Sequence, residues 1–128
     1  MANVWVSTPV VSSVGLVAGE AMDSGDLVYL ATDGKLYLAD SDEGTEEPCV
    51  GAVYEDAASG DTVSLVYEGD RNDGSSLTIG SQIFLSGTAG GFTQTLATTG
   101  NTTPQVVGFA LTASYWKFAP AQTYLTPA

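Results

Sequence analysis

The chain consists of short apolar runs separated by polar, glycine-rich turns. Several runs alternate apolar and polar residues, which is the pattern of a strand with one buried face. No window has the sustained spacing of three and four residues that indicates an amphipathic helix. The pattern predicts strands at about residues 14–18, 27–31, 35–39, 49–55, 61–68, 82–86, 92–96, 105–111 and 114–119.

Two of these runs make a specific prediction about which side chains share a face. In the run 61–68, the residues Val63, Leu65 and Tyr67 alternate with polar neighbours and with Val66, which places the three on one buried face. In the last run, the same alternation places Trp116 and Phe118 on one side of the strand.

The apolar runs fall into two tandem copies. The stretch Gly25–Leu30 returns as Gly80–Leu85, and Val50–Val53 returns as Val107–Ala110. The offset drifts only from 55 to 57 residues, as a small insertion in a connecting loop would produce. We therefore expect an all-β fold, a small β-barrel or sandwich built from two tandem, pseudo-symmetric strand repeats.

The expected organisation is one domain with extended ends. We expect a single β domain over residues 14–120, with repeat halves of about 14–70 and 71–120. An extended N-terminal arm at 1–13 precedes it and an extended tail at 121–128 follows it.

The arm holds two β-rich pieces separated by Pro9, which favours extended neighbours and cannot donate to a strand ladder. Such an arm pairs with an exposed sheet edge or buries Trp5 in a pocket elsewhere. Alternatively, it is the first strand of the domain's own sheet, and the sequence leaves both possibilities open.

Three segments predict hairpin turns. Thr32–Lys35 contains Asp-Gly, a pair that supplies the positive φ angles of a tight turn. Ala58–Asp61 and the glycine-rich segment Gly87–Gly91 predict two more.

Charge excludes several classes of partner. The net charge is −12, so the chain lacks the basic footprint of a nucleic-acid-binding protein or of a protein that binds anionic membranes. No apolar run approaches the roughly 20 residues that span a bilayer. The first residues lack the basic region and apolar core of a signal peptide, so we expect synthesis in the cytoplasm.

The acidic residues are unevenly placed. All fifteen lie between Glu20 and Asp73, whereas residues 74–128 carry only Lys117 among acidic and basic side chains. Residues 2–19 have no ionisable side chain. The acids either decorate solvated loops and keep the protein soluble, or leave the uncharged segments to face a partner or neighbouring copies.

Catalytic chemistry is not indicated. The chain has no His, which is the commonest general base and metal ligand, and its single Cys49 has no nearby base in sequence. We expect Cys49 to be a small buried apolar residue, and we expect no enzyme activity and no cofactor. The acidic segments Asp40–Glu47 and Glu68–Gly74 lack calcium-loop spacing and are interpreted as flexible acidic loops. The strand aromatics are expected in the core or at a subunit interface.

A set of motifs in fixed order resembles one protein family. The motifs are Ala18–Ala21, Ser24–Leu30, Asp33–Tyr37, Pro48–Val53 and Gly60–Val63, continued by Gly80–Leu85, Gly90–Thr93 and Val106–Ala110. Together they resemble the small decoration, or cement, proteins of tailed-bacteriophage capsids, over about residues 14–120.

The resemblance implies a virion structural protein. Such proteins typically form a homotrimer on the capsid exterior and clamp neighbouring major capsid protein subunits against internal pressure. An extended N-terminal arm adds to the contact in several of them, which makes Val4, Trp5 and Val6 the candidate contact residues. Alternatives are another virion β-module, such as a head-fibre base or tail ornament, and a lipoyl-type carrier or small-ligand barrel that would use Lys35.

Overall fold

The computed structural model describes residues 3–12, 14–41, 48–95 and 105–120, and the regular structure in these ranges is entirely β-strand. The all-β prediction is therefore confirmed. The strands are β1 (Val10–Val11), β2 (Leu16–Ala18), β3 (Leu27–Leu30), β4 (Lys35–Leu38), β5 (Gly51–Val53), β6 (Thr62–Val63), β7 (Leu65–Arg71), β8 (Gln82–Leu85), β9 (Phe92–Thr93), β10 (Val106–Ala110) and β11 (Trp116–Phe118).

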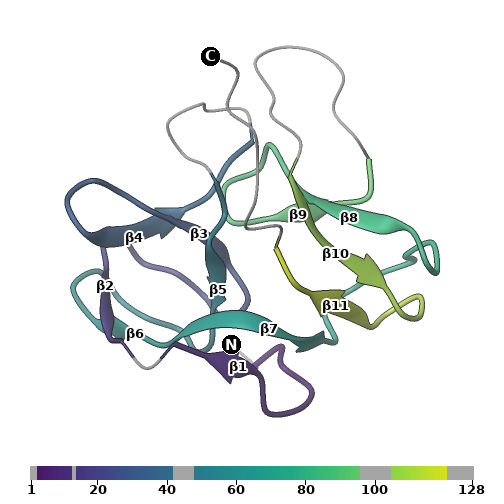
Figure 1. Cartoon of the computed structure of the whole chain (residues 1–128), viewed down its shortest axis with the longest axis horizontal. Coiled ribbons are helices and arrows are strands. Elements are labelled where there is room, and N and C mark those ends of the chain that lie inside the picture. The colour runs from purple at the N-terminus through teal and green to yellow at the C-terminus, as the bar shows by residue number, and fades with distance from the viewer. Residues whose placement is uncertain (1–2, 13, 42–47, 96–104, 121–128) are drawn as a thin grey trace.

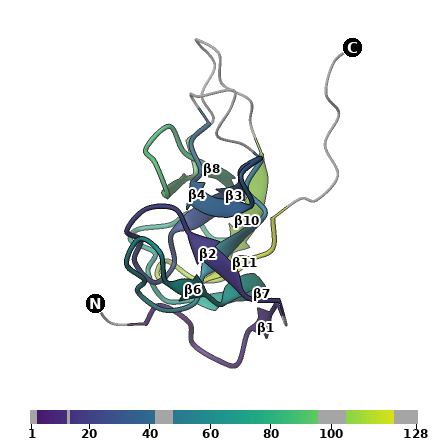
Figure 2. The same cartoon turned by 90° about the vertical axis from the view of Figure 1, so that its left-hand side faces the viewer.

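These strands form one sheet in the order β6-β2-β4-β3-β5-β7-β11-β10-β8-β9, with β1 paired to β7. The order has two ends, at β6 and β9, so the described sheet is not closed into a barrel and is closer to the sandwich-like alternative. In Figure 1, β7 runs along the base of the molecule from the strands of the first repeat towards β11. Figure 2 shows β1 beneath β7 at the same base.

The two sequence repeats are two structural repeats. In the first, β3 pairs with β4 and β5, and β5 pairs with β7. In the second, β8 pairs with β9 and β10, and β10 pairs with β11. The two four-stranded units join where β7 pairs with β11, residue Asp70 lying opposite Lys117. The predicted pseudo-symmetry is therefore confirmed.

The register is conserved between the copies as well. Val28 pairs with Gly51 in the first repeat, and Ile83 pairs with Gly108 at the same offsets in the second. Both glycines lie where strands approach closely. A Cβ on Gly51 would lie 2.7 Å from the carbonyl oxygen of Val66, and one on Gly108 would collide with the carbonyl oxygen of Lys117. A side chain at either position would force the paired strands apart.

Each repeat enters its first strand through the same turn. Gly25 and Gly80 have positive φ angles of 90° and 80°, and their N–H groups donate to the carbonyls of Val53 and Ala110, each at 2.8 Å. Gly60, with a φ of 93°, stands in a third turn of this kind, within the predicted Ala58–Asp61 hairpin.

The predicted Thr32–Lys35 turn connects β3 to β4, but with a different backbone from the one expected. Gly34 has a φ of 84° and its N–H donates to the Ala31 carbonyl at 3.0 Å. Ser76 is the one described non-glycine residue with a positive φ, so Asp33 does not share the positive angle. Gly34 alone supplies it, as in a turn followed by a glycine bulge.

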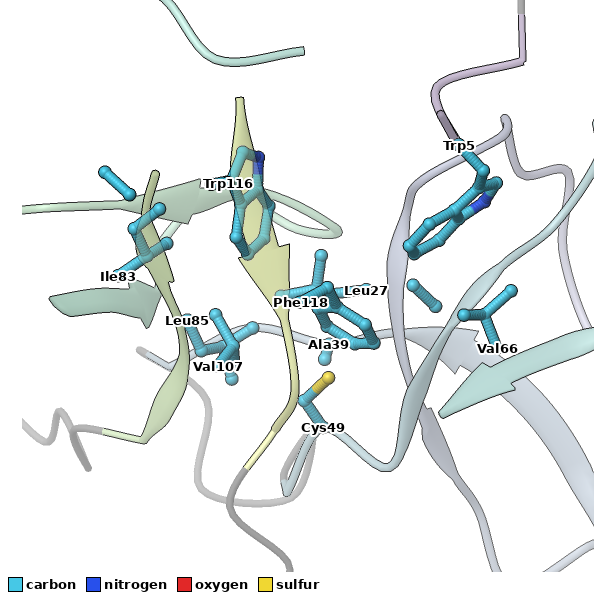
Figure 3. Close-up of a cluster of buried hydrophobic side chains, with 12 residues drawn as sticks. Trp5, Leu27, Ala39, Cys49, Val66, Ile83, Leu85, Val107, Trp116 and Phe118 are labelled. Atoms are coloured by element: carbon cyan, nitrogen blue, oxygen red, sulfur yellow. The ribbon is translucent and has the colours of Figure 1, made fainter. Parts of the chain in front are cut away.

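Two core clusters lie on the two sides of the first repeat. One consists of Ala18, Met22, Val28, Leu36, Val53, Val63 and Leu65, all from the first repeat and the strands that flank it. The other is shared by both repeats and the arm, and includes Trp5, Leu27, Cys49, Val66, Ile83, Leu85, Val107, Trp116 and Phe118 (Figure 3).

This arrangement corrects the face prediction for the run 61–68. Val63 and Leu65 are buried as expected, but Val66 is fully buried and Tyr67 is 43% exposed. The reason is that Leu65 belongs to the first-repeat cluster and Val66 to the shared cluster, so both faces of β7 are covered there. Trp116 and Phe118 share a buried side of β11, as predicted.

Candidate interaction surfaces

The arm, here residues 3–12, lies across β7 and is held by backbone bonds. The Val6 N–H donates to the Asp70 carbonyl and the Asn72 N–H donates to the Val4 carbonyl, both at 3.0 Å. Further along, β1 pairs with β7 between Glu68 and Val66. The arm therefore adds to the domain's own sheet, as the second of the two sequence interpretations expected.

The arm crosses β7 over Gly69. A Cβ on Gly69 would lie 2.8 Å from Pro9 and 3.1 Å from the Trp5 ring, so a glycine is required for the arm to approach this closely. The Trp5 indole N–H donates to the Val53 carbonyl at 3.1 Å. Figure 3 shows the ring above Val66 and facing Phe118, whose centroid lies 5.8 Å away.

The three predicted contact residues are therefore placed differently from one another. Trp5 is buried in the shared core, Val4 is half-buried and packs against that core, and Val6 is 49% exposed. Of the three, Val6 alone presents a large apolar surface to solvent in this conformation. Their role as contact residues stays a prediction.

Arg71, which the sequence did not single out, fixes the arm to both repeats. Its guanidinium is buried, and its carbon lies 4.5 Å from the Trp116 ring centroid and 5.2 Å from that of Trp5. Phe92 and Phe118 lie at 5.2 and 5.8 Å. Four aromatic rings around one buried cation provide cation–π stabilisation.

The charge of Arg71 is balanced by Asp73. The Nε and Nη2 groups donate to the two carboxylate oxygens of Asp73 at 3.1 and 2.5 Å, and the Trp116 indole donates to the same carboxylate at 2.9 Å. The Nη1 group has no hydrogen-bond acceptor among the described atoms. Because aromatic rings surround the guanidinium carbon, weak N–H···π contacts are available to this group.

An open pocket of about 590 Å³ adjoins this centre. Ser24, Asp26, Ser86 and Phe92 line it, together with the glycine-rich segment 87–91. Much of its polar lining is already bonded within the chain: Ser24 Oγ donates to the Tyr54 carbonyl, Ser86 Oγ to the Thr88 carbonyl, and Asp26 accepts from the Asp23 N–H. We therefore interpret the pocket as a junction between the repeats.

Asp26 is the pocket residue with a perturbed acidity. Burial raises the pKa of its carboxyl group above the ordinary value. The hydrogen bond from Asp23 and the charge of Arg71 oppose this rise, while the charges of Asp23 and Asp56 add to it.

The two acidic segments weighed as loops have different outcomes. Most of Asp40–Glu47 lies outside the described residues. The other segment is not a loop at its start, because Glu68–Arg71 belong to β7. Two of its three acids form ion pairs, Glu68 with Lys117 at 2.8 Å and Asp73 with Arg71. No group of three or more metal-ligating side chains occurs within the part of the chain that the structure describes.

Cys49 is buried, as predicted. Burial raises the pKa of its thiol to about 12, so the reactive thiolate is scarce at neutral pH. The Cys49 backbone also joins the two repeats through the side chain of Gln105. The Cys49 N–H donates to the Gln105 amide oxygen, and the Gln105 amide nitrogen donates to the Cys49 carbonyl, both at 2.8 Å.

A set of exposed apolar side chains lies on the second repeat. Phe109 pairs with Gln82 and Lys117, and Leu111 directly follows the end of β10. The Leu111 N–H donates to the Tyr115 carbonyl at 2.9 Å, and Ile79 lies in the adjoining turn, beside Gly80. We call Ile79, Phe109, Leu111 and Tyr115 the second-repeat face.

Comparison with known proteins gives no assignment, since no family model and no curated protein matches this chain. No membrane-spanning helix was found in the described ranges.

Proposed function

We propose that this chain is a decoration, or cement, protein of a tailed-bacteriophage capsid. It binds the outside of the phage head, as a homotrimer, and stabilises the lattice of the major capsid protein. It is made in the host cytoplasm and acts on the virion exterior, with no catalytic step, cofactor, nucleic acid or membrane.

One observation carries the proposal: along the chain, most of the exposed large apolar side chains lie outside the stretch that holds the acids. All fifteen acids lie between residues 20 and 73. Among the described residues, nine of the eleven exposed large apolar side chains lie outside that stretch, for example Val6, Val10, Leu111 and Tyr115, whereas Leu30 and Tyr67 lie within it. Exposed apolar side chains grouped in this way are typical of protein–protein contact sites.

Burial of such apolar surfaces between subunits can stabilise a capsid without any catalytic group or cofactor. Each contact would bury apolar area at roughly 25 cal/mol per Å². Simultaneous engagement of several shell subunits multiplies weak contacts into high avidity. The acidic remainder keeps decorated particles from associating with one another.

The test is a binding experiment with expanded, undecorated heads of tailed phages. The purified protein is expected to cosediment with these heads at saturable stoichiometry and to raise the temperature at which they release DNA. Immature, unexpanded shells are the control for the surface and are expected to bind less.

A matched pair of variants tests the arm. Val6→Asp places a charge on the predicted contact, and Leu30→Asp places one at an equally exposed position on β3 (49% and 48%). We expect at least tenfold weaker head binding for Val6→Asp and unchanged binding for Leu30→Asp. Absence of cosedimentation and an unaltered release temperature with every head type would refute the proposal.

A further inference from the structure

We propose that the outer edge of β9, with the pocket beside it, binds an extended segment of a partner protein that carries a lysine or an arginine. The proposal deepens the proposed function and rests on it for one point, the identity of the partner as a subunit of the shell. It adds the kind of segment that the partner contributes and the place on this chain that receives it.

The first repeat shows how the equivalent strand is covered. β4 pairs with β3 on one side and, in parallel, with β2 on the other, where Ala18 lies opposite Leu36. The Leu36 carbonyl accepts a hydrogen bond from the Gly19 N–H at 2.8 Å, and Leu36 is completely buried. β4 therefore has no free edge at this residue.

In the second repeat, β9 takes the place of β4 but pairs on one side only. Leu36 of β4 lies opposite Leu30, and Phe92 of β9 lies opposite Leu85, which is the same position of the repeated motif. β9 ends the described sheet, with β8 as its neighbour. Among the described strands, none fills beside β9 the place that β2 fills beside β4.

This arrangement leaves the backbone groups of Phe92 without a partner. The Ser86 N–H donates to the Gly91 carbonyl at 3.2 Å, whereas the Leu85 N–H points the other way, to the Gln105 carbonyl at 3.0 Å. In an antiparallel pair, this pattern directs the N–H and C=O of Phe92 away from β8. Within the part of the chain that the structure describes, neither group has a hydrogen-bond partner. A strand added to this edge would bond to both groups.

The pocket between the repeats adjoins this edge. Gly91, Phe92 and Thr93 line it on the β9 side, and Asp26 and Asp73 contribute to the rest of its lining. Its volume is about 590 Å³ and it is open to solvent, so a segment of another protein has access to it. A strand added along β9 therefore has room beside it for its side chains.

The charge of the pocket identifies the kind of segment. Arg71 and Asp73 form an ion pair, which leaves Asp26 as the lining charge without a counter-charge among the described residues. One carboxylate oxygen of Asp26 accepts from the Asp23 N–H at 2.9 Å, and the other has no donor in the described ranges. A lysine or arginine of the added strand would supply both a donor and the opposite charge, whereas a carboxylate would be repelled.

The first experiment measures amide hydrogen exchange of the full chain by NMR. The Phe92 N–H is expected to exchange at least tenfold faster than the Leu36 N–H, because β2 covers the edge at Leu36. The comparison is matched, since both residues occupy the same position of the repeat. Equal protection of the two amides would mean that another part of the chain already covers β9, and would overturn the proposal.

The second experiment titrates the full chain with two capped peptides, TVKVT and TVEVT, which differ only in the central charge. The lysine peptide is expected to shift the amide resonances of Phe92, Thr93 and Asp26 and to slow the exchange of the Phe92 N–H. Its dissociation constant should be at least tenfold lower than that of the glutamate peptide. Equal affinity of the two peptides, or resonance shifts confined to other strands, would count against the proposal and remove it.

A matched pair of variants tests the role of Asp26. Asp26→Asn removes the charge but keeps an oxygen that accepts from the Asp23 N–H, so the turn before β3 is preserved. Asp61→Asn makes the same change in the exposed turn where Asp61 accepts from the Ala58 N–H. We expect Asp26→Asn to bind the lysine peptide at least tenfold more weakly and Asp61→Asn to bind it like wild type. An Asp26→Asn protein that distinguishes the two peptides as wild type does would contradict the assigned charge pairing.

The peptide titration contains no phage head, so it separates this inference from the function on which it rests. Lysine-peptide binding at β9 by a protein that binds no head removes the function and leaves the inference. Head binding by a protein whose β9 edge binds neither peptide removes the inference and leaves the function.

Discussion

Arg71 is the one charged side chain that is buried among the described residues, and it is surrounded by four aromatic rings and one carboxylate. A buried charge that loses its partner is costly, whereas loss of both charges costs much less. We expect Asp73→Asn to lower the free energy of unfolding by about 2–3 kcal/mol, somewhat below the usual range for a buried pair because Asp73 is partly exposed. We expect Arg71→Met combined with Asp73→Asn to be less destabilising than the sum of the single changes.

Urea unfolding followed by tryptophan fluorescence measures both effects, because Trp5 and Trp116 lie beside Arg71. Glu68→Gln is the matched control, since it removes an exposed ion pair worth at most about 1 kcal/mol. Strict additivity of the two changes at Arg71 and Asp73 would contradict the assigned coupling.

Asp26 should make stability depend on pH. Burial raises its pKa in the folded state, so the folded chain binds more protons than the unfolded chain between the ordinary pKa and the raised one. Its contribution to stability therefore falls as pH rises through that window. Asp26→Asn removes this titration. We therefore expect the free energy of unfolding of Asp26→Asn, relative to that of wild type at the same pH, to increase as the pH rises from 3.5 to 7 (roughly the span above an ordinary Asp pKa).

Urea unfolding at a series of pH values checks this expectation. Asp61→Asn is the control, because Asp61 accepts a hydrogen bond from the Ala58 N–H in the corresponding exposed turn. An Asp26→Asn difference that is constant with pH, or that shrinks as pH rises, would show that burial of this carboxyl does not matter.

At the scale of elements, Trp5 is the arm residue that is buried in the shared core. Trp5→Ala removes a buried ring from the shared core and should cost about 3–5 kcal/mol. Trp5→Phe keeps an aromatic ring but loses the hydrogen bond to the Val53 carbonyl, and should cost about 1–2 kcal/mol. Val6→Ala is the control within the same element and should change stability by less than about 0.5 kcal/mol, because Val6 is exposed.

Chemical denaturation measures the three variants side by side. A Trp5→Ala protein as stable as wild type would mean that the arm is not docked in solution. The ring would then be free for a partner, as the alternative sequence interpretation supposed.

The strands and the repeat could be predicted because their causes are local. Alternation in β11 and the recurrent glycine before β3 and β8 depend on neighbouring residues only. The sequence left the docking of the arm as one of two possibilities, because the choice depends on Gly69 lying opposite Pro9 and Trp5 in space. Arg71 gave no signal in the sequence either, because charged residues are normally exposed and its aromatic neighbours come from distant strands.

The exposure of Tyr67 and the burial of Val66 illustrate the same limit within one strand. Alternation assigns one dry face to a strand, but β7 lies between two core clusters at Leu65 and Val66. The second buried face arises from tertiary packing. A strand that is buried on both faces shows no alternation of apolar and polar residues in its sequence.

At the scale of the whole molecule, the shared core makes the two repeats interdependent. The second repeat contributes Ile83, Val107, Trp116 and Phe118 to a cluster that it completes only with Leu27, Val66 and Trp5 of the other half. The first half also has a cluster of its own, around Val28, Leu36 and Leu65. We therefore expect the full chain to unfold in one cooperative transition, as a single domain, with circular dichroism and tryptophan fluorescence coincident.

Fragments give the sharper form of this expectation. A fragment of residues 72–120 should be unfolded by itself, because the buried apolar side chains of its described strands all belong to the shared cluster. A fragment of residues 1–71 should keep part of its β-structure around the first-repeat cluster, yet lose the native environment of Trp5, whose partner Phe118 is missing. Mixing the two should restore the native fluorescence, since β7 and β11 then pair again. Two separate transitions in the intact chain, or a second-half fragment that folds alone, would instead mean that the repeats are independent domains joined at β7.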